Sequence, residues 1–241
     1  MNKKHAPILQ TIREDLRRVP SVVAALFCVS VVSMNLLANK TIYESEVFAL
    51  DGGGLVSWVA FLCMDIVTKA FGQKTATTLS VFALFTNLLA SLIYFIASVI
   101  PTETDYSGFN TIFGGTWFIL LSSSIAFITS AVVNNYLNEA IGRRFQKNPD
   151  GKLAYAASSY ISTFIGQFWD NMVFVSLTFM VFAPIFWDGY RWTPVQCLTC
   201  SLAGAVLELL MEVVFSPLGY MVLARWRREG ICGTKAEGNE A

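Results

Sequence analysis

The chain has 241 residues, of which 54% are hydrophobic and only 14% are charged, and its formal net charge is zero. A soluble domain of this length would carry nearer a quarter charged residues. Apolar runs of about 18 residues or more recur, and each is long enough to cross the hydrocarbon core of a bilayer. The composition excludes an ordinary soluble protein and gives no indication of nucleic-acid binding, so we expect a helical membrane protein.

Residues 1–19 predict a cytoplasmic amphipathic segment that lies on the membrane surface. Four apolar side chains and three arginines accompany one another along residues 8–19: Ile8, Ile12, Leu16, Val19, Arg13, Arg17 and Arg18. A helix of this kind suits the interface of a bilayer that contains anionic lipids. No small-residue cleavage pattern follows the first apolar run, so we expect no cleavable signal peptide.

Six transmembrane helices are predicted next, which gives the fold class of an all-α membrane protein. In chain order they cover about residues 21–39, 54–72, 76–100, 116–139, 155–187 and 195–224. Turn-like or polar connections such as TIYESEVFALDGGG and PTETDYSGFNTIFGG separate them. The helices define a transmembrane domain at residues 20–224, and residues 225–241 are expected to be a disordered cytoplasmic tail.

The Lys and Arg residues predict that both termini are cytoplasmic. Five lie in the N-terminal tail, two at the connection of the second and third spans, four between the fourth and fifth, and four in the C-terminal tail. Only Lys40 and Arg191 fall on the opposite side. Such an excess of cations is typical of the cytoplasmic face, here that of a bacterial inner membrane.

An internal repeat with an offset of 36 residues links the fourth and fifth spans. SSSIAFITSAVVNN (122–135) aligns with SSYISTFIGQFWDN (158–171), and Asn134 falls opposite Asp170. Consecutive spans run in opposite directions, so this would be an inverted repeat, the kind whose meeting point often forms a transporter's midplane site. Chance similarity between serine-rich membrane helices is the alternative.

The fifth span carries the clearest binding candidates, Gln167 and Asp170. Insertion of one Asp at the centre of a membrane helix costs about 2.5–3.5 kcal/mol of free energy on a translocon scale. An Asp without a function at such a position would therefore be readily replaced. Gln167, Asp170 and Phe174 share a helical face, which predicts a ligand site. An interhelical hydrogen-bond clamp is the alternative. In the fourth span, Ser130 and Asn134 are candidates for the same site.

The sixth span adds Glu208 and Glu212, which lie one helical turn apart. Two glutamates at this spacing repel each other unless a cation or a proton lies between them. Glu208 falls near mid-span and is assigned to the substrate. Glu212 lies deeper toward the cytoplasm and is assigned, with Lys69, to a charge or proton network, with a structural pairing to Lys69 as the alternative.

The first and second spans contribute three further polar candidates. Asp65 and Lys69 are spaced i to i+4 with the acid first, the favoured order for an ion pair. A self-neutralising pair is preferred here to direct substrate contact by Asp65. Asn35 can both donate and accept hydrogen bonds to a ligand.

Enzymatic and metal chemistry find little support in the sequence. His5 is the only histidine, which removes HExxH metalloprotease chemistry and any Ser–His dyad. Cys197 and Cys200 form a CxxC without a second pair or a nearby histidine, so they are interpreted as small apolar filler. We expect no catalytic residues, no metal and no cofactor.

Four segments together resemble the vitamin uptake transporter family: MNLLANK (34–40), FLCMDIVTKAFG (61–72), SYISTFIGQFWDNMVF (159–174) and LELLMEVVFSPLGYMV (207–222). The resemblance covers about residues 20–224, and DIVTKAFG is its most specific part. It implies a six-helix fold, similar in outline to the substrate-binding subunits of energy-coupling-factor vitamin transporters. Characterised members carry precursors of the queuosine base, which are 7-deazaguanines.

The resemblance implies import of such a precursor, or of a similar purine- or vitamin-like solute, through a midplane cavity. Asp170 or Glu208 would accept two parallel hydrogen bonds from the deazaguanine ring N–H and amine, and Gln167 or Asn134 would read its carbonyl edge. The sequence also departs from the family, which often has Gln and Asp at Ala131 and Asn134 and usually has Lys near Glu208. The reversed charge fits a more cationic ligand, such as an aminomethyl-deazaguanine or another amine-bearing base or vitamin.

The expected partners are a small-molecule substrate and the lipid bilayer, and no nucleic acid is expected. The sequence allows a homodimer but does not predict one. An alternative is that the chain is the substrate-binding subunit of an energy-coupling-factor-type importer that needs an ATPase module, which the sequence does not indicate. Uptake in a cell without such modules would discriminate between the two.

Overall fold

The computed structural model describes residues 8–144 and 152–231, and the structural statements below concern this part of the chain. The side chains of two binding candidates, Asn134 and Glu212, lie outside the described residues.

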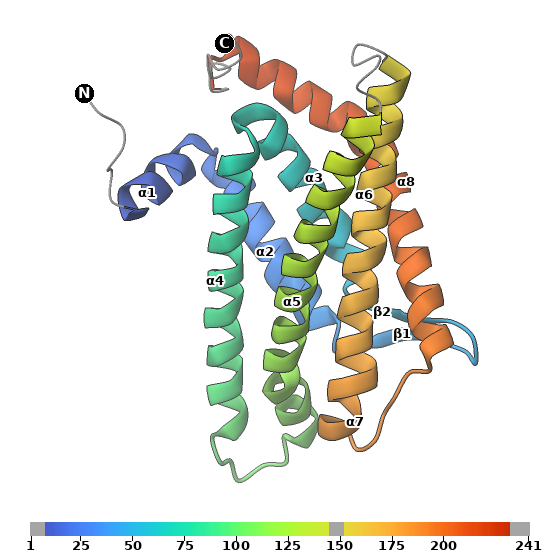
Figure 1. The fold of residues 1–241 in the computed structure, drawn as a ribbon. Coiled ribbons are helices and arrows are strands. Elements are labelled where there is room, and N and C mark those ends of the chain that lie inside the picture. Colours follow the sequence, from blue (N-terminus) through green and yellow to red (C-terminus); the bar gives the residue numbers. More distant parts are fainter. Residues whose placement is uncertain (1–7, 145–151, 232–241) are drawn as a thin grey trace.

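Helices make up most of the fold (Figure 1). They are α1 (Ile8–Arg18), α2 (Ser21–Leu37), α3 (Gly54–Phe71), α4 (Gln73–Val99), α5 (Ser107–Arg144), α6 (Lys152–Val175), the π-helical segment η2 (Ser176–Phe182), α7 (Ala183–Phe186) and α8 (Pro194–Arg228). Within the described residues, five helical stretches are long and apolar enough to cross a membrane, and the bent pair α1–α2 would make a sixth. The chain is therefore a mostly helical, multi-pass membrane protein, as its hydropathy predicts.

The long helices pack into one bundle in which neighbours along the chain are mostly neighbours in space. α4, α5, α6 and α8 follow one another around the bundle, while α3 packs against α8, α4 and α2. α5 and α6, which carry the two repeated segments, run antiparallel and side by side (Figure 1). α5 begins at Ser107, earlier than predicted, because the polar stretch before residue 116 is already helical.

The predicted amphipathic segment is the helix α1, which bends by 105° from α2. Its Asp15 is only 5% exposed and faces the start of α4. The Asp15 carboxylate lies 3.9 Å from Lys74 Nζ and 4.0 Å from the Arg18 guanidinium, and it accepts a hydrogen bond from Thr78 at 3.5 Å. These polar contacts attach α1 to the beginning of α4.

The connection between α2 and α3, which we predicted to be turn-like, contains a β-hairpin. Strands β1 (Thr41–Glu44) and β2 (Ala49–Asp51) pair antiparallel, with Thr41 opposite Asp51. β-branched and aromatic residues in TIYE favour a strand. Gly52 then brings the chain back against α2, since a Cβ there would lie 2.5 Å from the Leu37 carbonyl oxygen.

The start of α8 holds the tip of this hairpin. Thr193 and Gln196 form a capping box, with hydrogen bonds of 3.2 and 2.7 Å between their side chains and backbone amides. The Gln196 amide also donates to the Ser45 carbonyl at 2.6 Å, and the Thr199 hydroxyl donates to the Val47 carbonyl at 2.6 Å. The sequence that begins α8 therefore also fixes the position of the hairpin.

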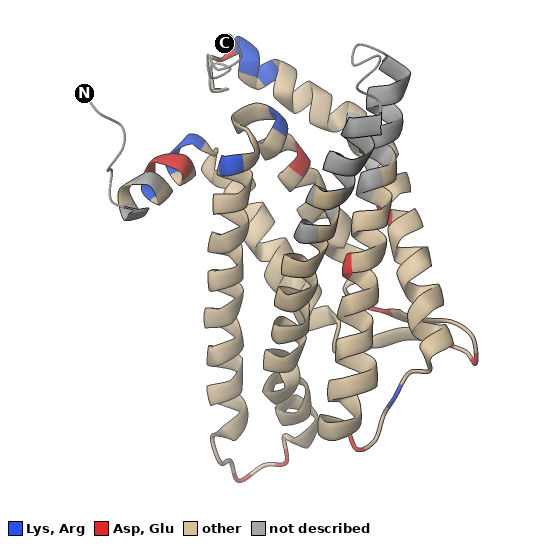
Figure 2. Cartoon of the chain, in the orientation of Figure 1, with Lys and Arg blue, Asp and Glu red and all other residues tan. Residues whose placement is uncertain are grey.

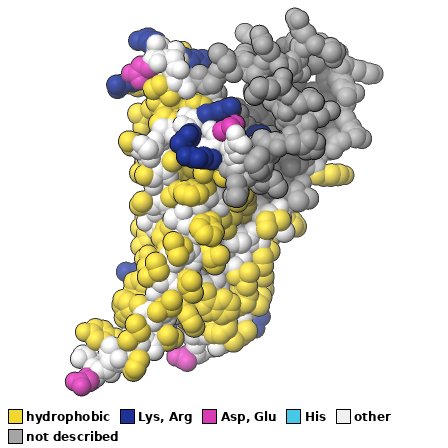
Figure 3. Space-filling model, turned by 90° about the vertical axis from the view of Figure 1, so that its left-hand side faces the viewer, with side chains coloured by type: hydrophobic (Ala, Val, Ile, Leu, Met, Phe, Trp, Pro, Cys, Tyr) yellow, Lys and Arg dark blue, Asp and Glu magenta, His cyan; other side chains and the backbone are white. Residues whose placement is uncertain are grey.

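The outer surface of the bundle is apolar between two charged ends. Lys and Arg gather at the end that carries both termini, and acidic residues lie mainly in the loops at the other end (Figure 2). The face seen in Figure 3 is covered by hydrophobic side chains. On α4, six large apolar residues are exposed: Phe82, Phe85, Leu88, Leu89, Leu92 and Ile93. Such a belt is what contact with lipid tails requires.

Candidate functional site

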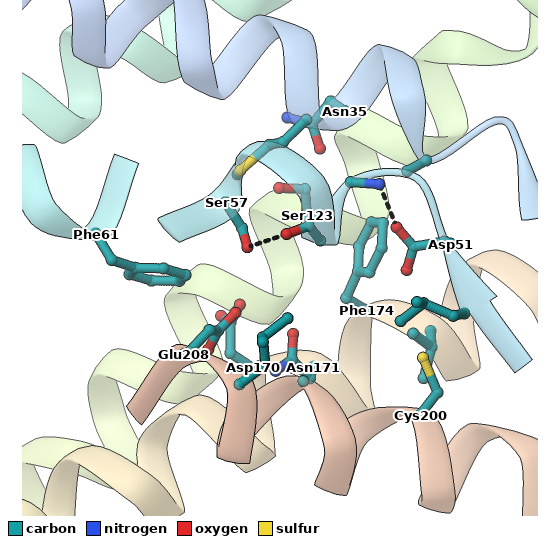
Figure 4. A pocket seen from close by; sticks show the side chains of 18 residues that line it. Asn35, Asp51, Ser57, Phe61, Ser123, Asp170, Asn171, Phe174, Cys200 and Glu208 are labelled. Carbon is teal, nitrogen blue, oxygen red and sulfur yellow. Dashed lines mark hydrogen bonds between the residues drawn. The ribbon is translucent and has the colours of Figure 1, made fainter. Parts of the chain in front are cut away.

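A cavity of about 90 Å³ lies inside the bundle, between α2, α3, α6 and α8, with β2 at one end (Figure 4). A water molecule needs roughly 10–15 Å³ of such volume, so the cavity has room for several waters or a small solute. Eight of its lining residues are polar or carry a thiol: Asn35, Asp51, Ser57, Ser123, Asp170, Asn171, Cys200 and Glu208.

The structure brings four of the predicted binding residues to this one cavity. Asn35 comes from α2, Asp170 and Phe174 from α6, and Glu208 from α8. Asn35 is 2% exposed and Glu208 is 8% exposed. These residues lie far apart in the sequence, and the packing of α6 against α8 places Asp170 and Glu208 on the same cavity.

Ser130 contributes to the site indirectly, by holding Asp170. Its hydroxyl donates a hydrogen bond to Asp170 Oδ1 at 2.8 Å, across the interface between α5 and α6. Ser130 itself does not line the cavity. Ser130 lies in the segment 122–135 and Asp170 in the segment 158–171, so the two segments that align in the sequence meet at this bond.

The remaining described candidates lie one helical turn further toward the end that carries the termini. Gln167 precedes Asp170 by three residues and does not line the cavity, and its side-chain oxygen is buried without a hydrogen-bond partner. Asp65 follows the lining residue Phe61 by four residues. Its carboxylate lies 2.6 Å from Lys69 Nζ, so these two residues form the self-neutralising pair expected from their spacing.

Two polar atoms at the cavity have no hydrogen-bond partner among the described residues. One is Glu208 Oε2 and the other is Asn171 Nδ2, and both atoms are buried. An unpaired buried donor or acceptor costs about 1–3 kcal/mol, and more when it is charged. The cavity therefore offers one unsatisfied acceptor and one unsatisfied donor to a ligand.

Asp51 is a cavity residue that the sequence analysis missed. It accepts a hydrogen bond from the Gly53 backbone amide at 2.6 Å, at the start of α3. It lies in the hairpin, outside the membrane-spanning segments, and its burial raises the pKa of the carboxyl from 3.8 to about 6. Asp51 ends β2, two residues before the Gly53 N-cap of α3, and nothing in the sequence DGGG marks it as a cavity residue.

Asn171 and Cys200 were also missed as cavity residues. Asn171 follows Asp170 directly, and its neutral amide carries no charge that would mark it within an apolar run. Gly204 of α8 lies against it: a Cβ at Gly204 would come within 2.9 Å of Asn171 Nδ2. Cys200 is buried with a free thiol, as is Cys197, and only Cys200 lines the cavity.

Comparison with known proteins places this arrangement in a family. The profile of vitamin uptake transporters matches residues 51–222, which is most of the chain. The chain belongs to the vitamin uptake transporter family. A protein of Bacillus subtilis (strain 168) named "Probable queuosine precursor transporter" is 29% identical over 160 residues, which cover 64% of this chain and 66% of that relative, just under two thirds. No solved structure matches the chain.

The family match covers most of the cavity. The matched range includes Asp51, Asp170 and Glu208, whereas Asn35 on α2 lies before it. The three carboxylates of the cavity are therefore part of the region that defines the family membership.

Proposed function

We propose that the chain imports a queuosine precursor, a 7-deazaguanine, or a similar purine- or vitamin-like solute across the bacterial inner membrane without converting it. One observation carries the proposal: a polar cavity that contains Asp170 and Glu208, inside a bundle whose surface is apolar, in a member of this family. Intramembrane acids are functional by default. The name of the Bacillus subtilis relative supports the choice of solute class.

The proposed topology has six spans and both termini in the cytoplasm. The end of the bundle that carries the termini also carries most Lys and Arg (Figure 2), as the positive-inside rule expects of a cytoplasmic face. α2 then counts as a span of 17 residues, about 25 Å at 1.5 Å per residue. The hairpin would lie on the outer side, where the cavity is nearest to the incoming solute.

The chemistry of a deazaguanine fits the residues at the cavity. Its ring N–H and exocyclic amine form a donor pair that the carboxylate of Asp170 or Glu208 can accept with two parallel hydrogen bonds. The unpartnered Asn171 amide can donate to the ring carbonyl, the role that the sequence analysis gave to Gln167 or Asn134. Phe61 and Phe174 supply aromatic rings on which a base can stack.

Uptake into liposomes that contain only the purified protein tests this proposal. We expect saturable uptake of radiolabelled 7-aminomethyl-7-deazaguanine that excess unlabelled compound suppresses. Asp170→Asn should abolish most of it, while Asp65→Asn, which removes a carboxylate outside the cavity, should leave it nearly unchanged. Binding without uptake would instead favour a subunit that needs an ATPase module, and the absence of both would overturn the proposal.

A further inference from the structure

Among the described residues, the cavity is lined by three carboxylates and by no cation. Asp51, Asp170 and Glu208 reach it from β2, α6 and α8, and none of its eighteen lining residues is Lys, Arg or His. The ion pairs found among the described residues use other acids, namely Asp15, Asp65 and Glu229. The partners seen for Asp170 and Asp51 are a hydroxyl and a backbone amide.

Three acids around one cavity are unfavourable unless a positive charge or a proton compensates them. A carboxylate taken out of water is costly unless a positive charge or a proton compensates it. Three acids around one small cavity also repel one another. A residue set of this kind is stabilised by a positive charge placed among the acids, and the described protein residues do not supply one.

Glu208 shows where that charge would be received. It is more than nine-tenths buried, it lines the cavity, and its Oε2 has no hydrogen-bond partner. Asp170 lines the same wall, where α6 packs on α8, and Figure 4 shows both side chains at the cavity. Asn171 Nδ2, also unpartnered, lies next along α6. A ligand group that donates to carboxylates, with an acceptor beside it for Asn171, would satisfy all three residues.

We propose that the solute is an organic cation: a flat base that bears a protonated amine, with the ammonium group bound at Glu208 and the donor edge of the base at Asp170. The inference rests on the proposed function and narrows it, because a neutral base of the same shape leaves the buried acids uncompensated. Charge-assisted hydrogen bonds from an ammonium to carboxylates are roughly twice as strong as neutral ones. The apolar part of the solute would lie against Phe61 and Phe174.

A matched pair of ligands tests the inference on the wild-type protein. 7-Aminomethyl-7-deazaguanine carries the ammonium, and 7-cyano-7-deazaguanine is its neutral counterpart with the same ring. Isothermal titration of the purified protein should give a dissociation constant at least tenfold lower for the aminomethyl compound. In Glu208→Gln the preference should fall to less than threefold, mainly through weaker binding of the cation. Asp105→Asn, which removes an exposed carboxylate in the loop between α4 and α5, is the control, with the wild-type preference expected.

Each outcome decides one of the two proposals. Equal affinity for both compounds, or a preference for the cyano compound, would overturn the cationic solute and leave a deazaguanine transporter standing. Binding of neither compound to folded wild-type protein would overturn the proposed function and the inference with it. If Glu208→Gln does not fold, judged by its gel-filtration profile, the comparison of the two compounds on the wild-type protein still decides the inference.

Discussion

The hydroxyl of Ser130 on α5 lies 2.8 Å from the carboxylate of Asp170 on α6 and donates a hydrogen bond to it. The bond fixes one carboxylate oxygen of Asp170, Oδ1, and Ser130 makes no hydrogen bond to the other oxygen, Oδ2. It also joins two antiparallel helices at the level of the cavity residue Asp170. Ser130 is therefore a positioning residue, and its effect on a ligand should pass through Asp170.

Ser130→Ala should weaken ligand binding without abolishing it. The change removes a hydrogen bond to a carboxylate, and such bonds contribute about 1.5–3 kcal/mol. Only part of that is expected in the affinity, so the dissociation constant of 7-aminomethyl-7-deazaguanine should rise about three- to tenfold in isothermal titration. Ser124→Ala is the matched control, because Ser124 bonds only to the Leu120 carbonyl of its own helix among described partners. A loss of equal size in both variants would contradict a specific role for Ser130.

Gly204→Ala should close part of the cavity. The added Cβ would lie 2.9 Å from Asn171 Nδ2, so the Asn171 side chain must shift, and we expect it to shift into the cavity that it lines. Affinity for the same compound should fall at least tenfold, while the melting temperature should change little, since alanine favours a helix by about 1 kcal/mol over glycine. Gly219→Ala on the same helix meets Ile66 only at 3.5 Å and should bind like the wild type. Unchanged affinity in Gly204→Ala would show that Asn171 moves away from the cavity.

Asp51 should give the stability of the protein a pH dependence. Burial raises the pKa of its carboxyl from 3.8 to about 6, so the folded state favours the protonated form. That stabilisation is fully present below about pH 4 and is lost as the pH rises through about 6. Relative to Asp51→Asn, the wild type should lose up to about 3 kcal/mol over this range, at about 1.4 kcal/mol per pKa unit.

Thermal unfolding of both proteins in detergent, from about pH 4 to pH 8, measures this difference. Asp105 provides a control of opposite sign, because the Ser107 backbone amide donates to its carboxylate and lowers the pKa. Relative to Asp105→Asn, the wild type should show no loss of stability over this range, because the stabilisation from a lowered pKa is already present above about pH 4. A wild-type curve that runs parallel to that of Asp51→Asn would refute the role given to Asp51.

The helices could be predicted from the sequence because apolar runs of membrane length allow few other structures. Asp170 and Glu208 were found for the same reason, since an acid in such a run is costly and stands out. Asp51 lies in a polar connection between two helices. An acid there carries no insertion free energy that would single it out in the sequence. Only the hairpin and Gly52, which returns the chain against α2, bring it to the cavity.

Depth along the helices could not be predicted. Gln167 shares a helical face with Asp170 and Phe174, so periodicity assigned it to the site. The cavity nevertheless ends at Asp170, and Gln167 lies a turn beyond it. Asp65 lies a turn beyond Phe61 in the same way. Helical periodicity predicts which side of the helix a residue faces. How far a cavity extends along the helix depends instead on how neighbouring side chains fill the bundle.

Tyr190→Phe should loosen the hairpin that adjoins the cavity. The Tyr190 hydroxyl donates to Glu44 at 2.7 Å and lies 3.0 Å from the Thr41 hydroxyl, and it accepts from the buried Trp192 indole at 2.9 Å. Its loss leaves the indole N–H unpaired, at a cost of about 1–3 kcal/mol. Amide exchange of residues 41–51, measured by mass spectrometry, should accelerate at least fivefold. Tyr43→Phe, whose ring is 56% exposed, should exchange like the wild type, and equal rates in all three proteins would show that Tyr190 does not hold the hairpin.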